Sequence, residues 1–192
     1  MRLLVTLVFA GLLGGCALLR MFDGEDPPPP APPAPRTVWI VGLDGRAIGQ
    51  ATFTEGAGGV LIRLEISEGA LSPGWHGVHV HQSGNCSDFA QGFAAAGSHA
   101  GHSPTSQHGL LNPAIGEAGD LPNLFAPAAG GFGVEFFSQR MTLLASSRDG
   151  RMPLLGRDGS ALVIHASADD HVTQPIGGAG ARVGCAALSA SP

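Results

Sequence analysis

Hydrophobic and polar residues alternate in short runs that are rich in β-branched and aromatic residues and separated by glycine. No segment repeats its apolar residues at the spacing of a long helix, and DG or GG dipeptides stand between the runs. Short alternating runs bounded by turn residues are typical of antiparallel β-sandwiches and barrels. The expected strands lie in TVWIVGLDG, GQATFTE, GVLIRLEISEG, HGVHVHQ, EFFSQRMTLL, ALVIHAS and ARVGCAALS. We therefore predict an all-β domain, with Trp39, Trp75 and the phenylalanines in its core.

Two long segments interrupt this pattern, one from Gln82 to about Phe132 and one from Ala166 to Ala181. Both are rich in histidine, aspartate, glycine and proline. Long segments without regular structure inside a compact domain are usually functional or disordered. Because of their composition, we predict that both are functional loops carried by the β scaffold.

The N-terminus reads MRLLVTLVFAGLLGGC, with one arginine, an apolar run and small residues before Cys16. The run is shorter than the ~20 residues that span a bilayer, so residues 1–15 are predicted to be an export signal. Leu13 to Cys16 resembles the lipobox of bacterial lipoproteins, in which the cysteine is lipidated and becomes the new N-terminus. The alternative is an ordinary cleaved signal with an incidental cysteine. We favour the lipoprotein because Cys16 stands where the apolar run stops.

Residues 16–36 are predicted to be the lipidated cysteine and a semi-rigid tether, because DGEDPPPPAPPAPR favours extended polyproline II. The folded domain then covers residues 37–192, a length that suits one domain with a core of its own. The chain has 15 acidic residues against 10 basic ones, and every basic residue is arginine. A basic stripe that would neutralise phosphates is missing, which argues against a nucleic-acid partner.

Two further cysteines, Cys86 and Cys185, lie far apart in the predicted domain. In an exported chain, oxidising conditions favour a disulfide between such an even pair. The alternative is two unrelated buried thiols.

Three histidines stand close together in GWHGVHVHQ, at His76, His79 and His81. Successive strand residues point to opposite faces, so His79 and His81 share a face. Two imidazoles side by side on a strand can hold one metal ion, although a pair of surface histidines is the alternative. His76 falls on the opposite face and is expected to support the structure through hydrogen bonds rather than to bind metal.

The remaining histidines fall mostly in the two loops or at a strand end, in the company of aspartates. They are His99, His102, His108, His165 and His171, with Asp120, Asp169 and Asp170. Imidazole together with carboxylate suits zinc or copper, and four nitrogens in one plane suit copper(II). The pattern therefore indicates a metal site made from distant parts of the chain.

Five blocks resemble, in the right order, motifs of bacterial copper,zinc superoxide dismutases over about Val38 to Ala186. WHGVHVH is similar to the family's HGFHVH, AAGSH to AGGH, GDLPNL to GDLP, LVIHASADD to LVVHAxxDD and GAGARVGC to GxGxRxACG. Five ordered blocks are far more specific than any one of them. The resemblance implies a Greek-key β-sandwich or flattened barrel of about eight antiparallel strands. It also implies two functional loops, a metal-binding loop and an electrostatic-type loop.

The resemblance also implies roles for individual residues. Copper would be bound by His79, His81, His99 and His165. Arg182 would guide the substrate anion and hydrogen-bond to it, and Cys86 would pair with Cys185. Asp169 matches an outer carboxylate that links one copper histidine to one zinc histidine, and such partners fix the orientation of ligands.

The implied zinc site departs from the family pattern. Bridging His99, His108 and Asp120 match, but the position three residues before Asp120, usually a histidine ligand, is Glu117. A carboxylate can bind zinc, so Glu117 can complete the site with one more negative charge. Alternatively, Glu117 faces solvent and His102 is the ligand. We favour Glu117 because its spacing to Asp120 is intact.

A second departure lies in GSHAGHSPTSQH, where Gly101 replaces the family's usual Asp or Asn and His102 has no counterpart. We prefer His99 as the residue that bridges copper and zinc, with His102 as its rival.

The implied activity is superoxide dismutase, in which copper(II) oxidises one superoxide to O2 and copper(I) reduces a second, with two protons, to H2O2. His99 would leave copper and take up a proton on reduction, while zinc keeps the ring in place. The chain would act in the bacterial cell envelope, facing the periplasm and anchored to a membrane by lipid at Cys16, and the sequence permits a homodimer. The alternative is a non-enzymatic copper-binding or copper-buffering lipoprotein, which has no need of Arg182.

Overall fold

The structure is a computed structural model that describes residues 31–112 and 116–189. The predicted export signal, Cys16 and most of the predicted tether lie outside these residues and stay predictions. The first strand begins at Arg36, next to the expected domain start at Thr37. Within the described part of the chain, no helix combines the length and apolar character that crossing a membrane requires.

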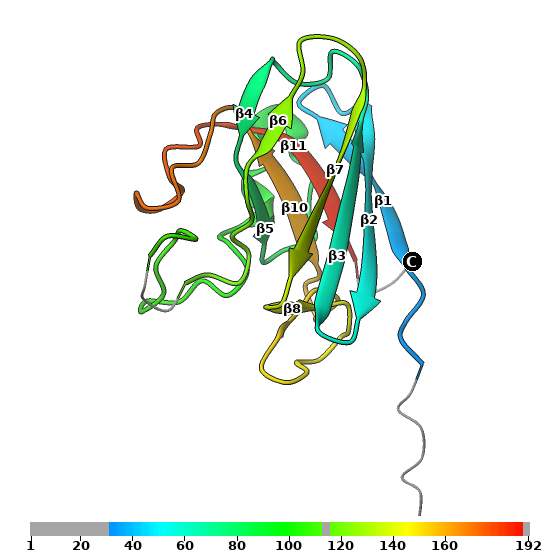
Figure 1. Ribbon diagram of the computed structural model, residues 1–192, viewed down its shortest axis with the longest axis vertical. Helices are drawn as coiled ribbons and strands as arrows, with labels where there is room; N and C mark the ends of the chain where they lie inside the picture. Colours follow the sequence, from blue (N-terminus) through cyan, green and yellow to red (C-terminus); the bar gives the residue numbers. More distant parts are fainter. Residues whose placement is uncertain (1–30, 113–115, 190–192) are drawn as a thin grey trace, which may run out of the picture. The chain divides into compact units, whose positions relative to one another are not determined.

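Seven strands form one antiparallel sheet that curls around the core (Figure 1). In order across the sheet they are β5 (Val78–His81), β10 (Ser160–His165), β11 (Arg182–Leu188), β1 (Arg36–Gly42), β2 (Ala47–Gly56), β3 (Gly59–Ile66) and β7 (Phe132–Ser138). The predicted all-β fold is confirmed. The order places β5 and β10, which carry three of the predicted copper ligands, side by side at one edge.

Four short strands outside the large sheet raise the number of strands above the expected eight or so. They are β4 (Gly74–His76) paired with β6 (Leu124–Ala126) and β8 (Met141–Thr142) paired with β9 (Met152–Pro153), beside the 3-10 turns η1 (Phe89–Gln91) and η2 (Ala94–Ala96). The β8–β9 pair is parallel, unlike the rest. Elements of two or three residues are too short to show a period in the sequence, and β6 and both turns lie inside the first predicted loop.

The alternating pattern has the expected physical cause. On β3, Ile62 and Leu64 are fully buried while Arg63 and Glu65 are exposed. Each large apolar side chain buried in this way stabilises the fold by about 1.5–3 kcal/mol. In β5 and β10 every residue is buried, because one face packs on the core and the loops cover the other. These two strands therefore hold their histidines away from bulk water.

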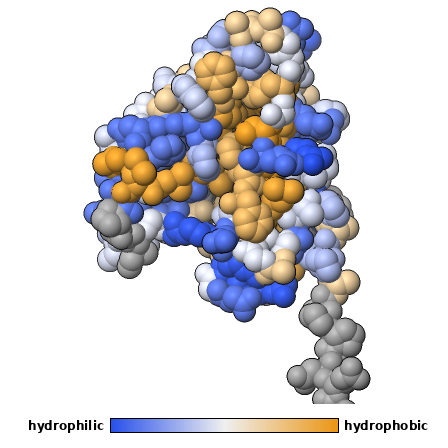
Figure 2. Space-filling model, in the orientation of Figure 1, coloured by the Kyte–Doolittle hydropathy of each residue, from blue (hydrophilic) through white to orange (hydrophobic). Residues whose placement is uncertain are grey.

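The expectation that Trp39, Trp75 and the phenylalanines are core residues is only partly correct. Phe53 and Phe93 are fully buried, but Trp39 and Trp75 are 61% and 57% exposed. Trp39 precedes buried Ile40 on β1 and so faces the other way. Trp75 instead stacks edge to face with Phe125 of β6, with ring centroids 5.1 Å apart. Figure 2 shows hydrophobic side chains gathered along the middle of one face, between hydrophilic ones.

A disulfide joins Cys86, which follows β5, to Cys185 on β11, with the two Cα atoms 5.8 Å apart. The predicted pairing is confirmed. The bridge lies in a small second core with Phe93, Ala161 and Val163. It thus fastens the start of the first long loop to the middle of the sheet.

Replacing both cysteines (Cys86→Ser with Cys185→Ser) should lower the free energy of unfolding by about 2–5 kcal/mol, because the unfolded chain loses a cross-link across a long loop. Urea denaturation of the metal-free protein measures the change. The parent chain treated with a thiol reductant is the matched control and should unfold like the variant. An unfolding free energy that does not respond to reduction would contradict the expectation.

Candidate metal centre

Four histidines from three parts of the chain meet in one buried group, here called the imidazole cluster: His79, His81, His99 and His165. One ring nitrogen from each lies within 4.8 Å of the others. His79 and His81 come from β5, His165 from the end of β10, and His99 from the first long loop. The structure therefore brings together the whole set that the resemblance implies for copper.

Hydrogen bonds outside the cluster fix three of these rings. The Nδ1–H of His81 donates to the Gly97 carbonyl at 2.8 Å, and that of His165 donates to the Gly180 carbonyl at 3.0 Å. The Nε2–H of His79 donates to Asp169 at 2.7 Å. In the neutral tautomers that these bonds select, the other nitrogen of each ring presents a lone pair to the cluster.

Within residues 31–112 and 116–189, these lone pairs have no suitable hydrogen-bond partner. His79 Nδ1 and His165 Nε2 lie 3.1 Å apart, and neither carries a proton in the selected tautomers. His81 Nε2 and His99 Nε2 are buried and have no hydrogen-bond partner in the described part of the chain. Buried polar atoms are rarely left unpaired. A bound cation would satisfy all four nitrogens, and a set of imidazole nitrogens suits copper.

A bulge in the sheet places His165. The register between β10 and β11 shifts between Ile164 and His165, so that His165 lies opposite Arg182. Bulges commonly redirect side chains next to active sites. This one puts a predicted copper ligand and the predicted anion guide at the same end of the sheet.

Loop segments form backbone hydrogen bonds along the outer edge of β5. Val80 N donates to Gly119 O at 2.8 Å, and Ala100 N donates to Val80 O at 2.7 Å. A Cβ added to Gly119 would lie 2.1 Å from Val80 O, so only glycine permits this approach. The same contacts pair His81 with His99 and His79 with Asp120. The loop ligands are therefore positioned directly by the strand that carries the first two histidines.

A second buried group, here called the carboxylate cluster, shares His99 with the first. It contains His99, His108, Glu117 and Asp120. His99 Nδ1 lies 2.8 Å from Glu117 Oε2 and 3.0 Å from Asp120 Oδ1, and His108 Nδ1 lies 2.9 Å from Asp120 Oδ1. Two imidazoles and two carboxylates are a donor set that zinc accepts.

His102, the rival ligand, lies outside both clusters. Its side chain is 49% exposed, whereas that of Glu117 is 4% exposed. Its Nδ1–H donates to Glu117 Oε1, the carboxylate oxygen that turns away from His99. The structure thus groups Glu117, rather than His102, with His99, His108 and Asp120.

Asp169 links the two clusters from outside. Its Oδ2 accepts the hydrogen bond from His79, and its Oδ1 lies 3.1 Å from His108 Nε2. Gly177 makes room for this carboxylate, since an added Cβ would lie 1.6 Å from Asp169 Oδ1. Asp169 therefore lies where the resemblance expects an outer carboxylate. The ring nitrogens of His76 lie 2.7 Å from the His165 carbonyl and 2.8 Å from the Ser72 carbonyl.

Two residues absent from the sequence-based site hold these groups in place. Asn123 pairs with the Asp169 backbone through both amide atoms, at 2.8 and 2.9 Å. Gln174 does the same for the His108 backbone, also at 2.8 and 2.9 Å. Asn123 follows the GDLP block and Gln174 follows the HASADD block, but side-chain amides in loops are too common to be noticed without the structure.

The clusters shift protonation in opposite directions. Burial lowers the pKa of His81 to about 2 and that of His165 to about 3, and burial also lowers the pKa of His79. Burial alone would lower the pKa of His108 as well, but hydrogen bonds to Asp120 and Asp169 raise it to about 10. His79, His81 and His165 thus favour the neutral ring with a free lone pair, whereas His108 favours the protonated, positively charged ring.

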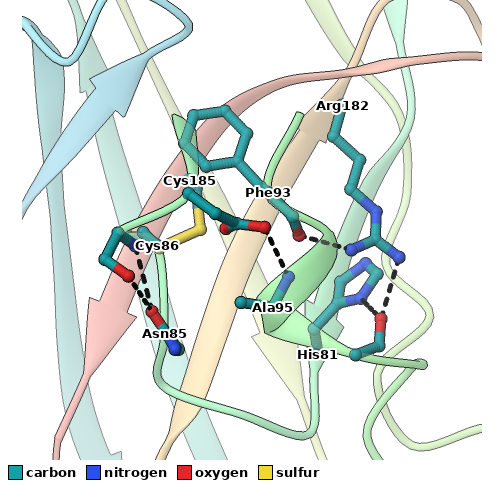
Figure 3. The surroundings of a disulfide bond; sticks show 10 residues. His81, Asn85, Cys86, Phe93, Ala95, Arg182 and Cys185 are labelled. Atoms are coloured by element: carbon teal, nitrogen blue, oxygen red, sulfur yellow. Dashed lines mark hydrogen bonds between the residues drawn. A yellow bond between two sulfur atoms is a disulfide. The ribbon is translucent and has the colours of Figure 1, made fainter. Parts of the chain in front are cut away.

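Arg182 lies beside the imidazole cluster, held by the loop that the disulfide fastens (Figure 3). Its guanidinium donates to Phe93 O at 2.6 Å and to Gly97 O at 2.8 Å, so it shares the Gly97 carbonyl with His81. A cavity of about 170 Å³ is lined by His99 and Arg182 among others, and a hollow of about 600 Å³ by His165 and Arg182. Arg182 is the one arginine among the residues that line either of these two spaces.

A family model described as copper/zinc superoxide dismutase (SODC) matches residues 47–188. The chain belongs to this family.

Known superoxide dismutases and a related protein resemble the chain over most of its length. A superoxide dismutase [Cu-Zn] of Caulobacter vibrioides is 47% identical over 145 residues, which are 76% of this chain and 80% of that protein. The crystal structure of the P104H mutant of a SOD-like protein from Bacillus subtilis aligns with a TM-score of 0.71 and 34% identity, covering 80% of this chain and 97% of that one. Cu/Zn superoxide dismutase from Brucella abortus aligns with a TM-score of 0.60 and 26% identity, covering 81% and 99%.

The family assignment confirms several sequence-based predictions. The chain has the fold of bacterial copper/zinc superoxide dismutases, its enzyme class is an oxidoreductase, its substrate is superoxide, and its cofactors are copper and zinc.

Asp169→Asn should weaken the binding of both metals roughly 10- to 100-fold, because an amide cannot accept hydrogen bonds from His79 and His108 through both of its atoms. Competition with a chelator measures each affinity. Asp170→Asn is the matched control, since Asp170 bonds to Val172 and Thr173 and to neither histidine. Equal metal affinities in the two variants would show that Asp169 does not position the ligands.

Proposed function

We propose that this chain is a superoxide dismutase tethered in the bacterial cell envelope, with copper in the imidazole cluster and zinc in the carboxylate cluster. The observation that supports this assignment is the position of His99. Its Nδ1 faces two carboxylates and its Nε2 faces three other imidazoles. A single ring can therefore belong to both metal sites.

In this proposal the copper ligands are His79, His81, His99 and His165, and the zinc ligands are His99, His108, Glu117 and Asp120. Copper bound there supplies one-electron redox chemistry that oxidises one superoxide to O2 and reduces a second to H2O2, while zinc supplies structural support. The unpaired lone pairs of the imidazole cluster suit copper. The two carboxylates beside His99 suit zinc.

The chain's own residues carry out the remaining tasks. Arg182, fixed by two backbone carbonyls, attracts the superoxide anion and donates hydrogen bonds to it. His99 Nε2 would hold copper and, whenever copper is not bound to it, would be able to take up a proton and deliver it to the reduced substrate. Both residues line the same small cavity, which has room for a diatomic anion and a few water molecules. One of the two protons that form H2O2 would therefore be delivered where the anion is held, and the other would come from water.

The N-terminal residues complete the proposal. Residues 1–15 direct export, Cys16 carries the lipid, and the proline-rich tether to residue 36 holds the domain, residues 37–192, at the membrane surface facing the periplasm. A confirmed disulfide is consistent with an oxidising compartment. The homodimer that the sequence permits stays a prediction, which sedimentation equilibrium of the domain would test.

Arg182→Ala should leave copper bound but lower superoxide turnover roughly 10- to 100-fold, because the variant loses the charge that attracts and holds the anion. His165→Ala removes a copper ligand and should lose copper and turnover together. Metal analysis and stopped-flow measurement of superoxide decay test both.

Arg63→Ala is the control for Arg182→Ala, since it removes the same charge from the exposed face of β3. A parent chain that holds copper but does not consume superoxide would favour the copper-buffering alternative. So would an Arg182→Ala variant as active as the parent.

Cys16→Ser should move the protein from the membrane fraction to the soluble fraction of a bacterial host that processes lipoproteins, because one acyl-bearing residue is lost. Fractionation together with labelling by a fatty acid measures this. A soluble, unlabelled parent chain would instead indicate the ordinary cleaved signal.

A further inference from the structure

Glu117 presents its two carboxylate oxygens to different neighbours. Its Oε2 lies 2.8 Å from His99 Nδ1, on the side of the carboxylate cluster. Its Oε1 accepts hydrogen bonds from His102 Nδ1 and from Ser106 Oγ, the latter at 3.2 Å. One oxygen is therefore available to a metal while the other is held from outside.

His102 is the main donor to that outer oxygen. Ser106 has a single hydroxyl proton and lies even closer to another acceptor, the Ser103 carbonyl at 3.0 Å. His102 Nδ1 has Glu117 Oε1 as its one side-chain partner among the described residues. Since half of its side chain is exposed, His102 adds little to the packed core. Its evident structural contribution is the bond to Glu117.

Arg140, between β7 and β8, holds the backbone of Glu117. Its guanidinium donates to Glu117 O at 2.8 Å and also to Gly116 O. A Cβ on Gly116 would lie 3.0 Å from Arg140 Nη1, so glycine leaves space for this contact. The Arg140 carbonyl in turn accepts a bond from Met152 N at 2.8 Å, which ties it to β9. The fork of the guanidinium suits two adjacent carbonyls in a way that lysine cannot reproduce.

A glutamate needs such support more than a histidine would. Its side chain has more freely rotating bonds than an imidazole and loses more freedom when it is fixed. A carboxylate can also turn either oxygen, or both, toward a metal. Outer contacts that choose one oxygen and one orientation therefore raise metal affinity, as hydrogen-bonded partners of ligands generally do.

We propose that His102 and Arg140 are positioning residues that hold Glu117 in place as a one-oxygen zinc ligand. This inference rests on the proposed function, because it assumes that zinc occupies the carboxylate cluster. His102 then acts through Glu117 and does not touch the metal. The pair Glu117 and His102 together takes the place of the histidine that the family usually has at this position.

The first test measures zinc affinity of the copper-loaded full chain in detergent by competition with a chelator. His102→Ala should weaken zinc binding roughly 10- to 100-fold. His102→Asn keeps an N–H donor near the position of Nδ1 and should restore affinity to within a few-fold of the parent. Thr105→Ala, an exposed change in the same loop without a contact to Glu117, is the control and should bind as the parent does.

A second measurement separates positioning from direct binding. In a Glu117→His background no carboxylate remains for His102 to hold, so adding His102→Ala should leave zinc affinity unchanged. Cobalt(II) in place of zinc reports the ligands by its visible spectrum. That spectrum should shift strongly in Glu117→His and should be the same in His102→Asn as in the parent.

Arg140→Lys keeps the charge but loses the fork, and it should weaken zinc binding several-fold while copper binding stays at the parent level. Unchanged zinc affinity in this variant would remove Arg140 from the proposal.

Two results would overturn the role of His102. A loss of affinity on His102→Ala that is equally large with Glu117→His present would make His102 a ligand, and no loss in the parent background would show that Glu117 needs no partner. Copper loading and superoxide turnover of the parent chain test the proposed function separately. They therefore distinguish a failure of the positioning role of His102 from a failure of the proposed function. A parent chain that binds no zinc overturns both, whereas normal zinc binding that ignores His102 overturns only the positioning role.

Discussion

The structure depends on one buried imidazole, His99, that belongs to two groups with opposite electrostatic preferences. Carboxylates surround its Nδ1, and neutral imidazoles surround its Nε2. The ring can serve both only if its backbone is fixed to about the precision of a hydrogen bond. The pairing of His99 with His81 at the edge of β5 provides that fixation, and the absence of a Cβ at Gly119 allows the second loop segment to approach the same edge.

Burial then gives the two groups their chemical difference. Burial lowers the pKa values of His79, His81 and His165 and keeps these three rings neutral, because a charged imidazole loses hydration energy inside the protein. In the carboxylate cluster, negative charge outweighs the same cost at His108. Asp169 touches both groups and so connects the orientation of His79 to that of His108. Two metal sites of different character can therefore lie side by side without separate scaffolds.

The sequence contained most of the scaffold and most of the candidate ligands. Short β-branched and aromatic runs between glycines located the seven strands of the large sheet, and the ordered blocks predicted that His79, His81, His99 and His165 form one group. Periodicity could not find β4, β6, β8 or β9, because two or three residues do not establish a period. It also misplaced Trp39 and Trp75, since an aromatic ring gives no indication of which face of its strand is covered.

What the sequence could not supply are contacts between side chains and loop backbone. Asn123, Gln174 and Arg140 act through carbonyl and amide groups whose positions depend on how distant loops fold together. Whether Glu117 or His102 joins the carboxylate cluster also depends on how the loops fold together. Spacing favoured Glu117 and left the nearby His102 as a rival, and only three-dimensional placement shows His102 donating a hydrogen bond to Glu117.

The carbonyl oxygen of Gly97 accepts hydrogen bonds from His81 and Arg182 at once. A change in the loop that moves this oxygen alters a member of the imidazole cluster and the nearby cation together. Natural selection on substrate attraction and selection on metal retention therefore act on the same short stretch of chain. A substitution there changes both the metal cluster and the cation beside it, so this loop has less freedom to diverge than its irregular backbone suggests.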